Sequence, residues 1–322
     1  MAATSGFNAF AQYGFESTFK TASTETNYKP FAFGMTVTRD ANNNPTYIYG
    51  IGDKDAVANT PGVFAGTGNI TGFLADPWWL GMFFGAPTDA GAGPYTHTYT
   101  DANEPVSFTT DINLELGATD SQIQLLGCVA QNIELSASVG DPIGFNLNFA
   151  YADEAESGTL TSNASMSYER PFFFQEGVAN IGGNLVQVQN FTLTIEQNPI
   201  MVNAIGTRES QAFTFGQRQY SFSFEKSYLD DDELEAFYGG ATPGSTVADD
   251  YLGPVQNSMT LTFNNGDAGA AQRQLVITLA NCFFDTHATN YASDAVVNET
   301  ITGQALSLTS AVATDNTSAP PA

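Results

Sequence analysis

The stretch GCVAQNIELSASVGDPIGFNLNFAY, residues 127–151, places two alternating runs on either side of Gly140-Asp141-Pro142. One set of side chains is apolar: Ile133, Leu135, Ala137, Val139, Phe145, Leu147, Phe149 and Tyr151. The residues between them are small or polar. Because successive side chains of a β-strand point to opposite faces, this pattern predicts a β-hairpin with one buried and one hydrated face. The hydrated face carries acid but no base and offers no obvious catalytic group.

Strand patterns of this kind recur along the chain. Apolar and polar residues alternate in 191–197 (FTLTIEQ), 220–226 (YSFSFEK), 259–263 (MTLTF) and 274–280 (QLVITLA). The intervening segments are rich in Gly, Asn, Asp, Thr and Pro, as turns require. Helical periodicity is confined to two short segments. The sequence therefore predicts a mainly β fold.

The two helical segments resemble each other. FLADPWWLGMFFGA, residues 73–86, and YLDDDELEAFYGGA, residues 228–241, align without a gap at a separation of 155 residues. Each has an Asp before an apolar run and a Gly at its end, which predicts an Asp N-cap and a left-handed Gly that ends the helix. The equivalent positions are Leu74, Asp76 and Gly85 in the first segment and Leu229, Asp231 and Gly240 in the second.

Further matches follow in the same order. Cys128 and Cys282 lie 154 residues apart, and Asp141 and Asp294 lie 153 residues apart. Ordered matches at nearly one separation indicate a tandem duplication. We expect one β domain over residues 1–170 and a second over 171–322. Each would contain two packed antiparallel sheets, or a sheet curling toward a barrel, with one short flanking helix. The cysteines would then be buried free thiols at equivalent core positions.

The charge of the chain is strongly unbalanced, with 34 acidic against 9 basic residues and a formal net charge of −25. Such a surface repels nucleic acid and anionic membranes. Three explanations stay open: a high-salt environment, a need for solubility, or a path along which a polyanion passes without adhering. The N-terminal segment has no basic region followed by an apolar run, so we expect no signal peptide. No apolar stretch reaches the roughly 18 residues of a membrane span.

No catalytic or metal-binding constellation is evident. His97 and His287 fall at unrelated places in the repeat and are expected to be loop or surface histidines. The acidic run 230–232 lacks the spacing of a calcium loop and is better explained by helix capping. Trp78 and Trp79 are expected to pack on a sheet, with a sugar-binding platform as the alternative. The sequence thus predicts no enzyme and no cofactor.

The order of the motifs resembles a known family. A G-F-L…L-G-x-x-x-G segment spans 72–85, the strand VSFTTDINLEL spans 106–116 and the G-C-V…L-S-x-x-x-G-D hairpin spans 127–141. In the second half, VQNFTLTIEQN (188–198) leads to the segment 205–240. Over roughly residues 10–310 the chain resembles the tail tube proteins of long-tailed phages and archaeal tailed viruses, in the group whose members carry two tube domains.

This resemblance implies a ring-forming β-sandwich whose rings stack into a hollow conduit for genome delivery. It also implies a structural protein of the virion tail, assembled in the host cytoplasm with tape measure, tail terminator and tail tip proteins. Viral DNA would pass through without specific binding, and no membrane would be involved. With two domains per chain, we expect trimeric rings of pseudo-six-fold symmetry, with a hexamer of two-domain subunits as the alternative.

The polar strand faces become candidates for the lining of this conduit, because small neutral and acidic side chains do not hold DNA. The candidate residues are Glu134, Ser136, Ser138, Asn146, Asn148, Thr192, Thr194, Glu196, Ser221, Ser223 and Glu225. An ordinary solvent-facing sheet is the alternative. The Gly- and Asn-rich stretch 38–69 is expected to be a long loop that joins rings along the axis.

Other classes of function stay open at this point. A cell-surface or S-layer-like β-sandwich would account for the acid and the Thr-rich strands. A carbohydrate-active enzyme or binding module would use Trp78 and Trp79. Another virion part, such as a tail terminator or a capsid decoration protein, would share much of the fold.

Overall fold

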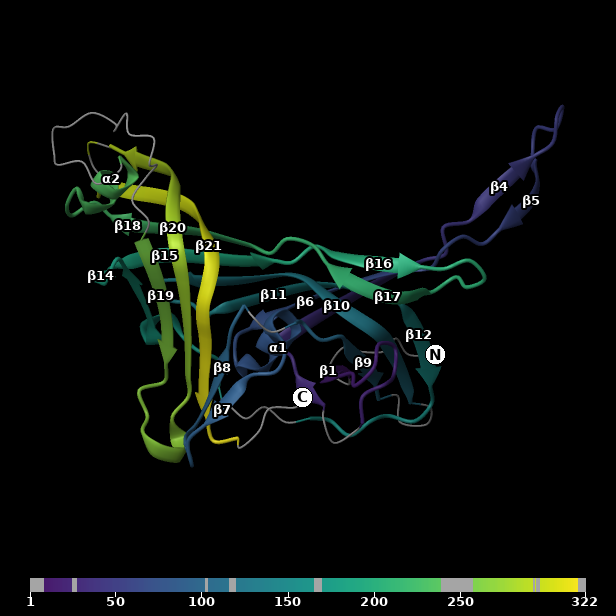
Figure 1. Ribbon diagram of the computed structural model, residues 1–322, viewed down its shortest axis with the longest axis horizontal. Coiled ribbons are helices and arrows are strands. Elements are labelled where there is room, and N and C mark those ends of the chain that lie inside the picture. Colours follow the sequence, from purple (N-terminus) through teal and green to yellow (C-terminus); the bar gives the residue numbers. More distant parts are fainter. Residues whose placement is uncertain are drawn as a thin grey trace.

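The computed structural model describes residues 9–24, 28–101, 104–115, 120–164, 170–238, 257–291, 293 and 296–317. This part of the chain consists mainly of antiparallel β-strands with a few short helical segments (Figure 1). The predicted mainly β fold class is confirmed. None of the described helices is long and apolar enough to cross a membrane.

One antiparallel sheet, which we call the shared sheet, joins strands from both halves of the chain. Its order is β3 (Phe33–Asn42), β6 (Ala65–Phe73), β11 (Gly144–Tyr151), β10 (Ser121–Ser138), β15 (Val188–Glu196), β18 (Gln219–Ser227), β21 (Asn298–Asp315) and β20 (Gln274–Asn290). The first four strands come from the N-terminal half of the chain and the last four from the C-terminal half.

These two groups of four strands pair in the same way. Across the first group, one row of facing residues is Val37, Ile70, Leu147 and Ile133. Across the second group, the corresponding row is Phe191, Phe224, Ile301 and His287, each 154 residues later. Equivalent residues of the two groups are therefore 154 positions apart in the sequence, the same separation as that of Cys128 and Cys282. The groups meet where β10 pairs with β15, with Ile133 opposite Ile195.

The long strands β10 and β20 both leave the shared sheet at a residue with positive φ. Gly127 has a φ of 62° and Asn281 a φ of 53°, and Gly and Asn are the residues that reach this region at low cost. Each is followed by a cysteine, Cys128 or Cys282, and both are free and buried, as predicted. Burial raises the pKa of both thiols, so neither behaves as a reactive thiolate at neutral pH.

Before these kinks, the long strands belong to two outer sheets. In the first, β10 lies between β9 (Phe108–Leu114) and β12 (Asp153–Ser157), and β1 (Ala9–Phe15) and β2 (Lys29–Pro30) follow beyond β9. In the second, β19 (Asn257–Asn264) pairs with β20, and β13 (Gly177–Ile181) and β14 (Asn184–Val186) follow beyond β19. The far end of β21 pairs with β8 (Tyr95–Tyr99), which pairs with β7 (Thr88–Ala90). A hairpin from the first half of the chain thus extends a sheet of the second half.

The apolar faces of these sheets enclose one core. Trp78 and Trp79 are fully buried in it, and the ring centroid of Trp79 lies 5.9 Å from that of Phe145. Their burial confirms the packing prediction and leaves no exposed tryptophan platform for a sugar. Aromatic rings of this size contribute much of the buried area that stabilises a β core.

The described short helical segments are η3 (Pro77–Leu80), α1 (Gly81–Phe84), η4 (Phe174–Glu176), α2 (Asp232–Phe237) and η5 (Gly269–Ala271). Every residue of η3 and α1 is buried in the core. Gly85, with a φ of 69°, ends the first helix as predicted. Asp76 and Asp231 stand at the N-cap positions, as predicted, although neither side chain makes a capping hydrogen bond to its helix. The carboxylate of Asp231 instead accepts a hydrogen bond from the hydroxyl of Tyr228.

Two β-hairpins extend from the same end of the shared sheet (Figure 1). The first arm, residues 43–64, contains β4 (Thr46–Tyr49) and β5 (Ala56–Thr60) and joins β3 to β6. The second arm, residues 197–218, contains β16 (Pro199–Asn203) and β17 (Ser210–Phe215) and joins β15 to β18. The prediction of a long loop over 38–69 is wrong, because this stretch forms the end of β3, the first arm and the start of β6.

Candidate functional site

The shared sheet has one buried face and one hydrated face, which we call the polar face. The side chains on the polar face include Thr36, Thr38, Asp40, Asn69, Thr71, Asn132, Glu134, Ser136, Ser138, Asn146, Asn148, Asn190, Thr192, Thr194, Glu196, Gln219, Ser221, Ser223, Glu225, Asn298, Thr300, Thr302 and Gln304. The residues that alternate with them, such as Leu135, Leu193 and Phe222, belong to the core. One face of the shared sheet thus packs in the core, and the polar face contacts solvent.

The structure brings all of the sequence-derived candidate residues together on this one face. Glu134 lies opposite Asn146 on β11 and Thr194 on β15, and Thr194 lies opposite Ser221 on β18. The other candidates fall in parallel rows: Asn148 with Glu196, Ser136 with Thr192 and Ser223, and Ser138 with Glu225. Residues from both halves of the chain therefore form one continuous surface.

Hydrogen bonds across the strands hold part of this surface in place. The amide nitrogen Nδ2 of Asn69 donates to Oδ1 of Asn146 at 2.7 Å and to Oδ1 of Asn148 at 2.8 Å. Nδ2 of Asn148 in turn donates to Oδ1 of Asn132 at 2.7 Å. This asparagine ladder joins β6, β11 and β10. Polar side chains that satisfy one another in this way present a fixed neutral surface to the solvent.

The charge on the polar face is exclusively acidic. Among the residues assigned to it above, the ionisable ones are Asp40, Glu134, Glu196 and Glu225, and there is no Lys or Arg. Glu225 accepts hydrogen bonds from Nδ2 of Asn190 at 2.7 Å and from Nδ2 of Asn298 at 3.0 Å. A surface of this composition gives an anionic polymer no cation to bind.

A charged cluster lies on the face of the second group of strands that is opposite to the polar face. The ammonium Nζ of Lys226 contacts the carboxylates of Glu233, Glu299 (3.2 Å) and Asp230 (3.6 Å), and Nε2 of His287 lies 2.7 Å from Glu299. Burial alone would lower the pKa of Lys226, but its bonds to Glu233 and Glu299 raise it. Buried ions of opposite sign that pair in this way avoid most of the cost of losing water. The residues 154 positions before Lys226, Glu233, Glu299 and His287 are Gly72, Trp79, Phe145 and Ile133, whereas the counterpart of Asp230 is again an aspartate, Asp76.

Both histidines differ from their predicted surface positions. His287 is in β20 with its side chain only 5% exposed. His97 is in β8, fully buried against Trp78, with Nδ1 2.7 Å from Asp89 and Nε2 3.5 Å from Asp315. Burial alone would lower the pKa of His97, but the contacts with Asp315 and Asp89 raise it above its ordinary value. His97 is buried because it lies on the inward-facing side of strand β8, where burial alternates along the sequence YTHTY.

Neither histidine contributes to a recognisable reaction centre. Within the residues that the structure describes, no group of three or more His, Cys, Asp or Glu side chains is arranged to hold a metal ion. The acidic run 230–232 leads into α2, where Asp232 occupies the first helical position. The arrangement of side chains points to structural roles for these residues.

The repeat-equivalent helix positions have unequal surroundings. Leu74 is fully buried, whereas the side chain of Leu229 is 66% exposed. Gly240, the counterpart of Gly85, lies outside the described residues. The helical segments therefore follow the repeat less closely than the strands do.

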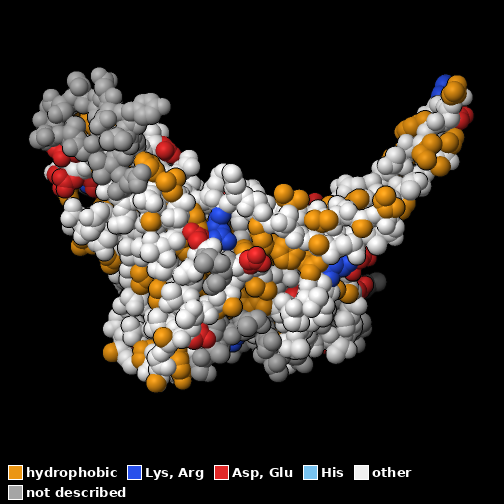
Figure 2. Space-filling view, in the orientation of Figure 1, with side chains coloured by type: hydrophobic (Ala, Val, Ile, Leu, Met, Phe, Trp, Pro, Cys, Tyr) orange, Lys and Arg blue, Asp and Glu red, His pale blue; other side chains and the backbone are white. Residues whose placement is uncertain are grey.

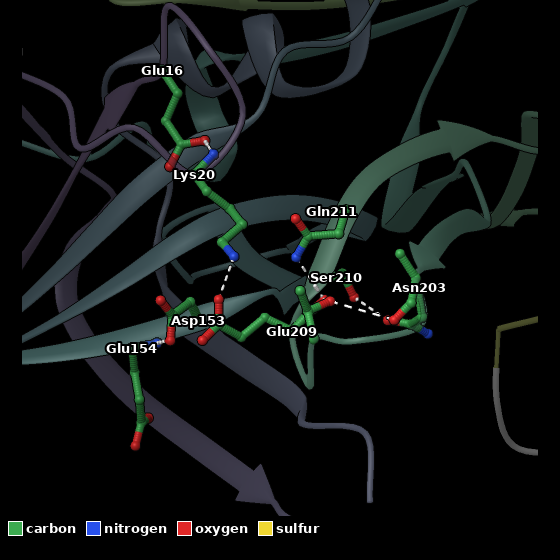
Figure 3. A network of polar contacts seen from close by, with 10 residues as sticks. Glu16, Lys20, Asp153, Glu154, Asn203, Glu209, Ser210 and Gln211 are labelled. Carbon is green, nitrogen blue, oxygen red and sulfur yellow. Dashed lines mark hydrogen bonds and ion pairs between the residues drawn. The ribbon is translucent and has the colours of Figure 1, made fainter.

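The second arm packs on the first half of the chain (Figure 3). Nζ of Lys20 lies 2.5 Å from the carboxylate of Glu209, and the rings of Phe19 and Phe213 are 5.1 Å apart. The backbone N–H of Lys20 is itself bonded to the buried carboxylate of Glu16 at 2.9 Å. One salt bridge near the tip and one aromatic pair on β17 thus tie the second arm to a segment almost two hundred residues away.

The first arm has no such support from the described residues beyond its base. There, Arg208 at the tip of the second arm donates to the carbonyl oxygen of Gly62 at 3.0 Å and to Oδ1 of Asn43 at 2.6 Å. Beyond this contact, apolar side chains of the first arm face solvent, as Figure 2 shows. Ile51 at its tip is fully exposed. Exposed apolar groups on a projecting element mark an interaction surface.

The sequence analysis missed these arms, although a repeated motif identifies them. The first tip reads Ile-Gly-Asp-Lys-Asp over 51–55, and the second reads Ile-Gly-Thr-Arg-Glu over 205–209, again 154 residues later. Gly52 and Gly206 both have positive φ, and Ile205 is as fully exposed as its counterpart Ile51. The tips therefore share a positive φ at the glycine, a projecting isoleucine and a basic residue followed by an acidic one.

Comparison with known proteins adds a family to this geometry. A family model described as phage tail tube protein matches residues 6–314 of the chain. A search of curated proteins found no match. The matched region includes both groups of strands, both arms and the whole polar face.

Proposed function

Because the chain belongs to the phage tail tube protein family, we propose that its copies close into rings that stack into a hollow tail tube, with the polar face lining the bore. As a member of this family, the chain is a structural protein of the virion tail, and its family is not one of enzymes. Of the three explanations for the acidic composition, we therefore adopt the third, in which DNA passes along the protein without adhering to it.

The observation that carries this proposal is the composition of the polar face. DNA binds protein surfaces mainly because Lys and Arg displace the counterions of its phosphates. The polar-face residues named above offer Ser, Thr, Asn, Gln and four carboxylates, and none of them is a Lys or Arg. Repulsion from the carboxylates keeps the polymer hydrated and centred, so that it slides during delivery. A surface that only needed solubility would also accept lysine.

The repeated strand registers bear on the symmetry of the ring. Each chain supplies two equivalent groups of strands, so three chains would supply six such groups. We therefore propose trimeric rings with pseudo-six-fold symmetry, and we treat residues 1–170 and 171–322 as the two duplicated tube domains. A six-fold ring of whole chains is the alternative, in which the second domain would decorate the outside.

The arms are suited to hold successive rings together. The second arm projects from the end of β15 and the first from the end of β3, whereas an apolar groove of about 290 Å³ lies beside the start of β15. Val139, Val178 and Leu185 are exposed along this groove. Two different surfaces at opposite ends of one subunit give a head-to-tail contact, which polymerises along an axis. We further propose assembly in the host cytoplasm with tape measure, tail tip and terminator proteins, which membership of the family supports.

Electron microscopy of the purified protein tests the tube directly. End-on class averages should show hollow rings with three-fold or pseudo-six-fold symmetry, and side views should show stacks. Flat two-dimensional lattices or closed dimers without a channel would refute the tube and favour a surface-layer protein.

Labelling of single cysteines tests the orientation of the sheet. In assembled tubes, a protein-sized maleimide reagent should fail to modify Ser136→Cys, because the bore excludes it. Both Ser136→Cys and the control Ser157→Cys, on β12, should react in the unassembled subunit. Rapid modification of Ser136→Cys along the whole tube would place the polar face outside.

A further inference from the structure

The shared sheet ends in two strands that lack a neighbour among the described residues. On one side, β3 pairs only with β6. On the other side, the part of β20 that follows Cys282 pairs only with β21. Within the described part of the chain, the outer edges of both segments therefore have no partner strand. Edges of this kind pair with another strand unless the protein blocks them.

The pairing of β10 with β15 inside the chain shows how a strand can cover an edge of this kind. At the junction of the two groups of strands, β10 pairs with β15 with Ile133 opposite Ile195 and Glu134 opposite Thr194. The first group ends at β10 on this side, just as the second group ends at β20. The second group begins at β15, just as the first group begins at β3. A second copy of the chain placed after β20 would repeat the same junction.

On this basis we propose that the end of β20 pairs antiparallel with β3 of a second copy, with His287 opposite Ala41 and Ala288 opposite Asp40. The register follows from the internal junction, because His287 lies 154 residues after Ile133 and Ile195 lies 154 residues after Ala41. The inference rests on the proposed function, since repetition of this contact generates a closed ring. It assigns the partner, the strands and the register of the contact.

Local backbone features support the transfer of register from β10 to β20. In β10 the pairing with β11 shifts between Ala130 and Asn132. In β20 the pairing with β21 shifts between Phe284 and Thr286, at the equivalent positions. Because both long strands carry the same irregularity after the same left-handed kink, the edge of β10 that pairs with β15 and the open edge of β20 present hydrogen-bonding groups in the same phase.

The proposed junction also continues the polar face. Thr286, Ala288 and Asn290 would lie opposite Asn42, Asp40 and Thr38 of the second copy. All six are small, neutral or acidic, like the residues at the junction within the chain. If the second copy were shifted by one residue, its two faces would be exchanged relative to the first copy. Arg39 and His287 would then lie beside polar-face residues of the neighbouring copy.

The buried side of the two junctions differs in a way that suits an interface between separate chains. The internal junction uses Ile133, Leu135, Leu193 and Ile195, which are buried. The equivalent positions of the open edges hold His287, Thr289, Arg39 and Ala41. The charged cluster of Lys226, Glu299 and His287 likewise replaces an apolar group. Polar and charged residues on an open edge keep the free subunit from aggregating.

Disulfide trapping with engineered cysteines tests the register. The two native thiols are buried, so they leave a clean background. Ala288→Cys and Asp40→Cys are introduced in separate preparations, which are mixed, assembled and oxidised. Directly opposed Cα atoms in an antiparallel pair are about 4.5–5.5 Å apart, within the range of a disulfide. The matched control combines Ala288→Cys with Asn42→Cys, two residues out of register.

We expect the first mixture to give a covalent dimer on a non-reducing gel and the control mixture to give little. The double variant Ala288→Cys/Asp40→Cys should give a ladder that ends at the size of the ring, because both edges of each copy are then linked. Rings that form without this cross-link, or a stronger cross-link in the control mixture, would overturn the register while leaving the tube intact. Absence of rings in micrographs of the wild-type protein would instead count against the proposed function itself.

Discussion

A contact between a glycine and a phenylalanine gives the most detailed test of how this sheet packs. Gly68 on β6 lies opposite Phe149 on β11, and a Cβ added at Gly68 would come within 2.2 Å of the ring carbon Cζ of Phe149. The ring cannot move away, because it is fully buried and packs edge-on against Phe108 at 5.6 Å. Gly68→Ala should therefore destabilise the protein by overpacking, by about 1–3 kcal/mol.

A double-mutant cycle separates this clash from other effects of the substitution. Phe149→Leu removes the outer ring atoms and should by itself cost about 1–3 kcal/mol. In the double variant the new methyl group occupies part of the space that the ring has left. The combined loss should then fall short of the sum of the single losses by about 1 kcal/mol or more, as is typical for residues in contact.

The assay is urea unfolding of the unassembled subunit, followed by the fluorescence of the buried Trp78 and Trp79. Gly158→Ala serves as the control, because its Cβ would meet only a carbonyl oxygen at 3.9 Å and should change stability by less than about 0.5 kcal/mol. An additive cycle, or a Gly68→Ala variant as stable as Gly158→Ala, would refute the account. At Gly303, where the large and small partners are exchanged, a Cβ would meet the carbonyl oxygen of Phe283 at 2.1 Å as well as the ring of Phe222 at 2.6 Å, so Phe222→Leu should relieve only part of the loss there.

Three further predictions follow from buried groups and from the kinks. Glu16→Ala should lower the free energy of unfolding by about 3 kcal/mol, because four hydrogen-bond donors lose a buried acceptor; a loss below that of an average surface variant in urea titration would contradict this. Gly127→Ala should cost at least about 1–2 kcal/mol at its left-handed φ, whereas Asn281→Gly should cost little, and equal melting shifts would be the contrary result. Because the pKa of His97 is raised in the folded state, its stabilisation is complete below about pH 6.5 and is lost as pH rises through the folded pKa. Asp315→Asn should flatten this part of the stability–pH profile, and an unchanged slope would contradict the assignment.

The strands of the shared sheet were predictable because their alternation is strict. Residues such as Ser136 and Ser223 could be assigned to a hydrated face from period alone, and the structure puts them in one row. The pairing of β10 with β15 could not be predicted, because alternation specifies which face is buried and not which strand lies next to it. The separation of the cysteines carried more information than expected, since it equals the offset of every register in the shared sheet.

The errors have local causes. The arm strands are short and exposed, so the first arm shows no alternation of burial that a sequence pattern could reveal. Its signal was the recurrence of Ile-Gly and a basic–acidic pair at 51–55 and 205–209. The sequence spacing around His97 and His287 suggests no partners and so predicts surface positions, whereas the carboxylates of Asp315 and Glu299 on a distant strand allow both side chains to be buried. Ion pairs between residues far apart in the chain cannot be recognised from the sequence around either residue.

The measurement that tests the central claim most directly is a helical reconstruction of the assembled protein at a resolution that shows side chains. The account predicts a hollow tube whose inner wall is the polar face, with Glu134, Ser136 and Ser223 lining the bore and no basic side chain between them. A reconstruction with these residues on the outer surface, or buried between rings, would contradict it.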